Sequence, residues 1–188
     1  MPLSVSGKVR LTLHALQWLT LGLWAIWLVG YWWGRLPFNR HDGLDTALIL
    51  AIALGSAVIF ITGVVICLEW VEITTLYLPP AVTVMGMVLV MLGIGGTVYA
   101  RRCLGRFWTA EAVLQSDHQV IETGPYGYVR HPIYTAAILL NIGTLLVFAT
   151  YWTLIAGVVV GTAYILKAKL EDHLLAVNLP GYPVYQTR

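Results

Sequence analysis

The chain has 188 residues, of which 59% are hydrophobic and only 11% are Asp, Glu, Lys or Arg. Soluble domains are about 45–50% apolar and about 25% charged, so this composition, with a mean hydropathy of +0.77, predicts an integral membrane protein. The net charge of +2 comes without a run of basic residues, which argues against nucleic acid as a partner. Five spans of about 20 residues would use roughly 100 positions and leave too few for a separate soluble domain of usual size.

Apolar runs predict an all-α fold with about five transmembrane helices. The first three are expected over residues 16–33, 46–68 and 81–100, and Asp45 can cap the second of them. The apolar stretch 132–166 is too long for one span at about 1.5 Å per residue, so a break near residues 149–152 should fold it into a helical hairpin. The chain therefore divides into an N-terminal region, residues 1–100, and a C-terminal region, residues 101–188.

Small residues and charges add detail to these spans. Four glycines of the third span predict close approach to a neighbouring helix: Gly86, Gly93, Gly95 and Gly96. The segments after the third and fifth spans are basic, whereas the loop with Glu69 and Glu72 contains no Lys or Arg. The basic segments are therefore predicted to face the cytoplasm and the N-terminus to lie outside.

Polar residues concentrate in two pieces of the C-terminal region, residues 117–134 and 167–172. A hairpin between them returns both pieces to one side of the membrane. We therefore expect a cytosol-facing pocket built from residues 101–134 and the tail that follows residue 166.

The first polar piece suits a charged ligand. Pro132 fits the first position of a helix, whose free N–H groups, beside Arg130 and His131, can bind a carboxylate or phosphate. Tyr126 and Tyr134 add aromatic faces that can stack on a purine or lie against a cation. The alternative is that Arg130 and the tyrosines only anchor the helix at the level of the lipid head groups.

The second polar piece contains a pair of carboxylates, Glu171 and Asp172, after two lysines. Such a pair can hold an amine, ribose hydroxyls or a metal, and the alternative is a solvated helix end with Lys167 and Glu171 paired at i,i+4. The histidines show no H-x-x-x-H spacing and Cys103 stands alone, so no metal site is predicted.

Together, the two pieces are more specific than either alone. The run from Gly124 to Tyr134 follows two shorter stretches, residues 104–108 and 118–121, and precedes Glu171, Asp172 and residues 179–185. Taken together, these residues resemble the isoprenylcysteine carboxyl methyltransferase family. Related membrane enzymes that methylate phospholipid head groups share the pattern. The resemblance covers about residues 100–188, and R-H-P-x-Y with a downstream acidic pair is its signature.

The resemblance implies S-adenosylmethionine as methyl donor, bound without a Rossmann fold. The residues that it places along the adenosyl group are His118, Gln119, Val120 and Ile121, with Tyr126 beside them. The residues that it places at the methionine end are His131, Pro132, Ile133 and Tyr134, with Glu171 closing the site.

The resemblance also implies a lipophilic acceptor, such as a prenylcysteine-type carboxylate, and makes the C-terminal region catalytic. The candidate catalytic residues are Arg130, Lys167 and Asp172. Lys167 stands where prenylcysteine enzymes carry an arginine, and it keeps the charge but not the bidentate fork. A carboxylate acceptor needs no general base, whereas an amine or thiol would need one, with Glu171, Asp172 or His131 as candidates.

Other functions are compatible with parts of the pattern. A phospholipid or amine N-methyltransferase would use the same donor. A non-catalytic transporter or accessory subunit explains poorly why polar residues gather at one mouth of the bundle. A reductase would need nicotinamide, for which no phosphate-cradling glycine loop is present. The expected partners are the lipid bilayer and a lipophilic or prenylated small molecule, and both monomer and dimer are compatible with the sequence.

Overall fold

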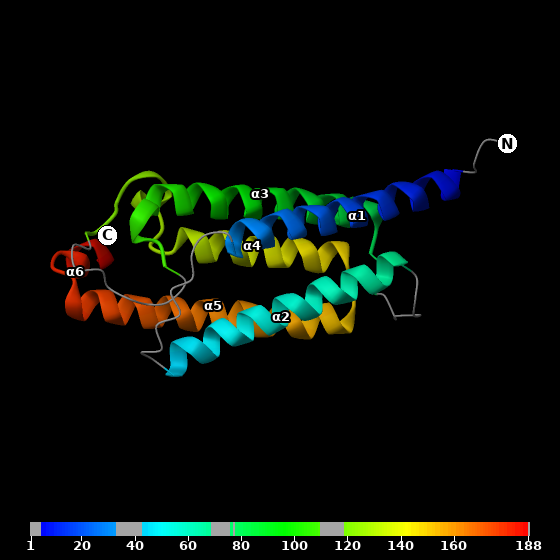
Figure 1. The fold of residues 1–188 in the computed structure, drawn as a ribbon. Coiled ribbons are helices and arrows are strands. Elements are labelled where there is room, and N and C mark those ends of the chain that lie inside the picture. Colours follow the sequence, from blue (N-terminus) through cyan, green and yellow to red (C-terminus); the bar gives the residue numbers. More distant parts are fainter. Residues whose placement is uncertain (1–4, 33–42, 69–75, 77, 110–118, 188) are drawn as a thin grey trace.

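The computed structural model describes residues 5–32, 43–68, 76, 78–109 and 119–187 (Figure 1). Within these ranges every regular element is a helix, so the predicted all-α class is confirmed. The long helices are α1 (Val5–Trp32), α2 (Gly43–Leu68), α3 (Pro80–Leu104), α4 (Pro132–Val147) and α5 (Tyr151–Asn178). The short ones are η1 (Gly105–Phe107), η2 (Gly124–Gly127) and α6 (Tyr182–Gln186).

The long helices form a bundle in which each one runs opposite to the one before it (Figure 1). Helices α1, α2, α3 and α5 are long and apolar enough to cross a membrane, and α4 is a shorter apolar helix of 16 residues. The bundle therefore agrees with the prediction of about five spans. The N-terminus lies at the end opposite to α6 (Figure 1), as an odd number of spans requires, and which end faces the cytoplasm stays a prediction.

The predicted helical hairpin is confirmed. Helix α4 ends at Val147 and α5 begins at Tyr151, where Thr150 and Thr153 form a reciprocal cap. The Thr150 hydroxyl accepts a hydrogen bond from the Thr153 N–H at 3.0 Å, and the Thr153 hydroxyl accepts one from the Thr150 N–H at 3.0 Å. This cap satisfies backbone donors at a buried turn, where unsatisfied groups would be costly.

Two predicted helix ends are wrong in the same way. The first span was expected to begin near residue 16, but α1 begins at Val5 and includes Lys8 and Arg10. The fifth span was expected to end at residue 166, but α5 continues to Asn178 and includes Lys167, Glu171 and Asp172. The length of an apolar run reflects the thickness of the membrane and not the length of the helix. Lys, Glu and Leu are good helix formers, so they extend a helix beyond the apolar run into the polar region.

Close approach of α3 and α4 positions the start of α4. A Cβ added at Gly93 would lie 2.5 Å from the Leu140 backbone nitrogen, and one at Gly86 would lie 2.7 Å from the Gly143 carbonyl oxygen. The prediction from the glycines is thus confirmed for Gly86 and Gly93, and also for Gly96, where a Cβ would lie 2.9 Å from the Ala136 Cβ. Nothing lies within 4 Å of a Cβ at Gly95. Because α3 belongs to residues 1–100 for most of its length, this tight interface joins the two predicted regions of the chain.

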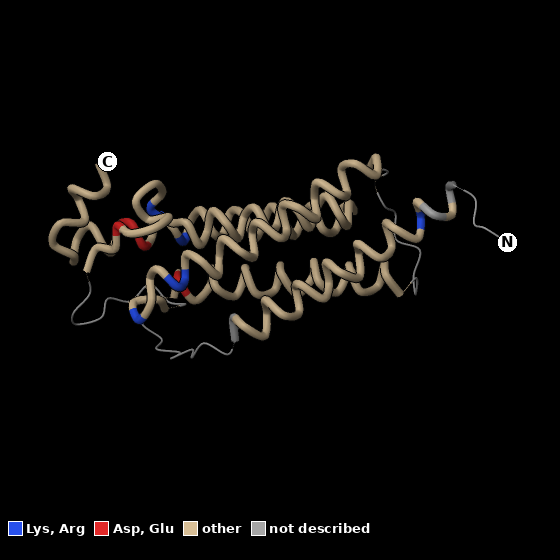
Figure 2. The backbone as a smooth tube through the Cα atoms, turned by 90° about the horizontal axis from the view of Figure 1, so that it is seen from above, with Lys and Arg blue, Asp and Glu red and all other residues tan. Residues whose placement is uncertain are grey.

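Charged residues occur at the ends of the bundle and not along its length (Figure 2). Apart from Lys8 and Arg10, the charged residues in the described ranges lie at the end where α3 and α5 finish and α2 and α4 begin. The polar chemistry of the described chain is therefore concentrated at one end of the bundle, next to α6.

Candidate active site

A cavity opens at this end of the bundle, beneath the segment that follows α5. Four stretches of chain form its wall: the end of α3 with η1, residues 119–126, the start of α4, and the end of α5 with α6. The lining residues are Leu104, Phe107, Trp108, Thr109, Gln119, Val120, Ile121, Tyr126, Arg130, His131, Ile133, Tyr134, Glu171, Leu174, Leu175, Leu179, Tyr182 and Tyr185. We call it the polar cavity.

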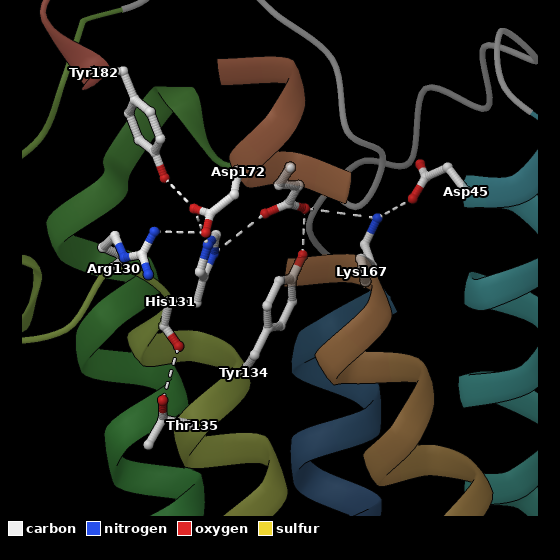
Figure 3. A network of polar contacts seen from close by, with 9 residues as sticks. Asp45, Arg130, His131, Tyr134, Thr135, Lys167, Asp172 and Tyr182 are labelled. Carbon is white, nitrogen blue, oxygen red and sulfur yellow. Dashed lines mark hydrogen bonds and ion pairs between the residues drawn. The ribbon is translucent and has the colours of Figure 1, made fainter. Parts of the chain in front are cut away.

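Asp172, on α5, joins the start of α4 to α6 at the wall of the polar cavity (Figure 3). Its carboxylate accepts hydrogen bonds from Arg130 Nη1 at 2.7 Å and from the Tyr182 hydroxyl at 2.6 Å. His131 Nε2 lies 2.8 Å from the same carboxylate. Asp172 itself does not line the cavity, so its contacts orient the side chains that do.

Glu171, the neighbour of Asp172, lies near the other ring nitrogen of His131. It accepts a hydrogen bond from the Tyr134 hydroxyl, and its Oε2 lies 3.7 Å from His131 Nδ1. The rings of His131 and Tyr134 are stacked, with centroids 5.7 Å apart and planes at 13°. His131 is therefore held between two carboxylates, and Glu171 and Tyr134 present polar atoms to the cavity.

Lys167 lies one helical turn before Glu171 and is almost completely buried, with 3% of its surface exposed. Its ammonium pairs with Asp45, which is 4% exposed, and lies 3.7 Å from Glu171 Oε1. The prediction that Asp45 caps the second span is wrong, because α2 begins at Gly43 and Asp45 lies inside its first turn. The Asp45 carboxylate joins α2 to α5 instead. The ion pair of Asp45 and Lys167 compensates two charges that are too buried to be solvated.

The segment after α5 folds back over the polar cavity and is fixed by two tyrosines. The Tyr185 hydroxyl donates to the Tyr126 carbonyl oxygen at 2.6 Å, and Tyr182 donates to Asp172. Burial raises the pKa of both Tyr126 and Tyr182 above the usual value for a phenol, and the nearby carboxylates raise it further. Both phenols are therefore neutral at physiological pH, and the Tyr182 hydroxyl keeps the proton that it donates to Asp172.

A second, larger cavity lies beside the polar one, between α1, α2, α3 and the ends of α4 and α5. It has a volume of about 950 Å³ and is lined mainly by apolar side chains such as Ile26, Ile49, Ile52, Phe60 and Ile61. Four residues line both cavities: Trp108, Thr109, Ile133 and Tyr134. We call the second cavity the apolar groove and these four residues the junction.

Comparison with known proteins assigns the chain to a family. Residues 84–176, from α3 through most of α5, match the model of the isoprenylcysteine carboxyl methyltransferase (ICMT) family. The chain belongs to this family. It is a multi-pass membrane protein of a methyltransferase family, as the resemblance in the sequence predicted. A comparison with curated proteins gave no match.

The ICMT-family chain brings most of the predicted site residues to one place. Those that line the polar cavity are Gln119, Val120, Ile121, Tyr126, Arg130, His131, Ile133, Tyr134 and Glu171. Pro132 is buried at the first position of α4, and Lys167 lines the apolar groove instead. His118 lies outside the described residues, as do Glu69 and Glu72.

Sequence reasoning missed several lining residues of this ICMT-family site. Leu104, Phe107 and Trp108 belong to a motif that carried the resemblance, as do Tyr182 and Tyr185, but no role was predicted for them. Leu174 and Leu175 also line the polar cavity. Aromatic residues clustered outside the spans were the available signal for the first group, whereas leucines on a helix give no signal that separates a pocket wall from a lipid-facing surface.

Proposed function

We propose that this ICMT-family protein transfers a methyl group from S-adenosylmethionine to a lipophilic acceptor, with a prenylcysteine-type carboxylate as the acceptor of first choice. The observation that carries the proposal is the junction, where a polar cavity suited to a charged nucleoside meets an apolar groove open to a lipid tail. Two substrates of such different polarity can meet only at such a place.

The residues of the polar cavity fit the donor. No side chain caps the start of α4, so the positive end of its dipole can stabilise the carboxylate of the methionine end. Glu171 suits the ammonium, and the aromatic rings of Trp108 and Tyr126 suit the purine and the sulfonium. When bound, S-adenosylmethionine supplies an activated methyl group.

The chain's own part is orientation and the exclusion of water. Asp172 fixes Arg130 and His131, while Tyr134 is fixed by Glu171, so the polar side of the junction is rigid before any ligand arrives. Trp108 and Ile133 present apolar surface at the junction, and this surface keeps water from the reacting atoms. A carboxylate acceptor is already ionised, so correct placement supplies most of the rate enhancement that the protein must provide.

A second candidate acceptor is a lipid amine. The supporting observation is that Tyr134, a junction residue, donates to Glu171, which is in turn 3.7 Å from His131. A proton leaving an amine at the junction could therefore pass through the Tyr134 hydroxyl to Glu171, which would act as the general base.

Ligand titration tests the proposal. The detergent-purified protein should bind S-adenosylmethionine and S-adenosylhomocysteine saturably in calorimetry, and should not bind NADPH. His131→Ala and Glu171→Ala should each lose this binding while keeping a cooperative thermal transition. Lys169→Gln is the matched control, because Lys169 is exposed on α5 and lines neither cavity.

The alternative outcomes are distinct. Normal binding in both site variants would contradict the assignment of the polar cavity. If the folded native protein binds neither S-adenosylmethionine nor S-adenosylhomocysteine, a transporter or accessory subunit is favoured. Binding of NADPH alone would favour a reductase.

A further inference from the structure

The charges of the apolar groove are all of one sign. Among its lining residues within the described ranges, the charged ones are Arg101, Arg102 and Lys167, and none is an acid. All three lie at the end of the groove that meets the junction, since α3 and α5 both finish there. An occupant with an anionic head and an apolar tail would match this distribution of charge.

Lys167 is the least suited of the three cations to such a head group. Its ammonium is almost completely buried, pairs with Asp45 and lies 3.7 Å from a second carboxylate, that of Glu171. The two carboxylates already compensate its single positive charge. A further anion placed against Lys167 would be repelled by both carboxylates in a region of low dielectric constant.

Arg101 is placed differently, beside a junction residue. Its guanidinium carbon lies 3.7 Å from the ring centroid of Trp108, and its Nη1 donates to the Gly30 carbonyl oxygen of α1 at 3.3 Å. The stacking on Trp108 orients the planar guanidinium at the boundary between the two cavities. Arg101 is thus a positioned cation adjacent to the point where the nucleophile must lie.

We propose that Arg101 binds the oxyanion of the acceptor, a carboxylate or a phosphate, and thereby sets the head group of an anionic lipid at the junction; the proposal rests on the proposed function. A guanidinium matches the two oxygens of a carboxylate or phosphate bidentately. The lipid tail then extends along α1 and α2, over the apolar lining of the groove. Arg101 is therefore the acceptor-binding residue, and Lys167 is the buried link between α2 and α5.

Steady-state kinetics of the full-length protein in detergent tests this assignment with three probes. N-acetyl-S-farnesylcysteine presents a carboxylate, lysophosphatidylethanolamine presents a phosphate and an amine, and farnesylamine presents no anion. Arg101→Gln should raise the KM for the anionic probe that is turned over by roughly 10- to 100-fold, the range expected for loss of a charge-assisted contact. The kcat and the affinity for S-adenosylhomocysteine should stay near those of the native protein, and Arg101→Lys should give an intermediate KM.

Arg10→Gln is the matched control, because it removes the same charge from an exposed arginine near the start of α1, at the opposite end of the bundle. A rise in KM confined to the carboxylate probe identifies the head group as a carboxylate, and one confined to the phosphate probe identifies it as a phosphate. An unchanged KM for both anionic probes in Arg101→Gln overturns the proposal. Turnover of farnesylamine alone, with the same KM in the native protein and the variant, overturns it as well.

Failure of the proposed function can be recognised separately. If the native protein does not bind S-adenosylhomocysteine, the function fails, and binding of the anionic probes is then measured by thermal shift. Stabilisation of the native protein but not of Arg101→Gln supports the anion site on its own. Equal stabilisation of the native protein and the variant overturns it.

Discussion

Replacing Lys167 by Met should destabilise the protein by about 3–5 kcal/mol. This is the cost typical of removing one member of a buried ion pair, because the Asp45 carboxylate stays buried after the ammonium that faces it is removed. Lys167 and Asp45 are 3% and 4% exposed, so water cannot replace the lost partner. Asp45→Asn should cost less, since Lys167 still lies 3.7 Å from Glu171.

The double variant Asp45→Asn with Lys167→Met carries the decisive comparison. It leaves neither buried charge, so most of the stability lost in Lys167→Met should return. The measurement is the unfolding free energy in a mild detergent with increasing denaturant, with exposed Lys169→Met as the control for the change in net charge. A loss below about 1 kcal/mol in Lys167→Met, or a double variant no more stable than Lys167→Met, would refute a structural role for the ion pair.

Three further predictions concern the interface between α3 and α4 and the side chain of Tyr182. Gly93→Ala should destabilise the bundle by about 1–3 kcal/mol or more, because the new methyl would overlap the backbone of Leu140, whereas Gly95→Ala should be tolerated; thermal unfolding distinguishes them. Tyr182→Phe removes the hydrogen bond to Asp172 and should weaken S-adenosylhomocysteine binding several-fold in calorimetry, and native affinity in this variant would contradict the role given to the segment after α5. Burial and the bond to Asp172 raise the pKa of Tyr182, so the folded protein holds this proton more tightly than the unfolded chain. The resulting stabilisation is complete below about pH 10 and is lost as the pH rises through the folded-state pKa, so unfolding temperatures above pH 10 should fall less steeply in Tyr182→Phe than in the native protein.

The sequence contained enough information for the helices and for much of the polar cavity. Apolar runs report burial in lipid, and the alternation of runs and polar breaks gave the five helices and the hairpin at Thr150. The run from Gly124 to Tyr134 is a contiguous motif, so its contribution to the site could be predicted from local order. Glu171 could be added because a hairpin must return its two ends to the same side.

The remaining features depend on distances in space that the sequence does not encode locally. Asp45 and Lys167 are 122 positions apart, and Asp45 alone looks like an ordinary helix cap. The contact of Arg101 with Trp108 arises because η1 turns the chain back on the end of α3. Such pairings follow from how the helices pack, and composition and periodicity reveal only which helices exist.

The attachment of α6 has a consequence for how the protein is made. Helices α1 to α5 can enter the membrane in the order of their synthesis, but the polar cavity still lacks one wall until Tyr182 and Tyr185 reach Asp172 and the Tyr126 carbonyl. Those tyrosines leave the ribosome after all five long helices. A nascent chain would therefore complete the polar cavity as the last event of folding, so a partly synthesised protein would lack two of the side chains that line the proposed donor site.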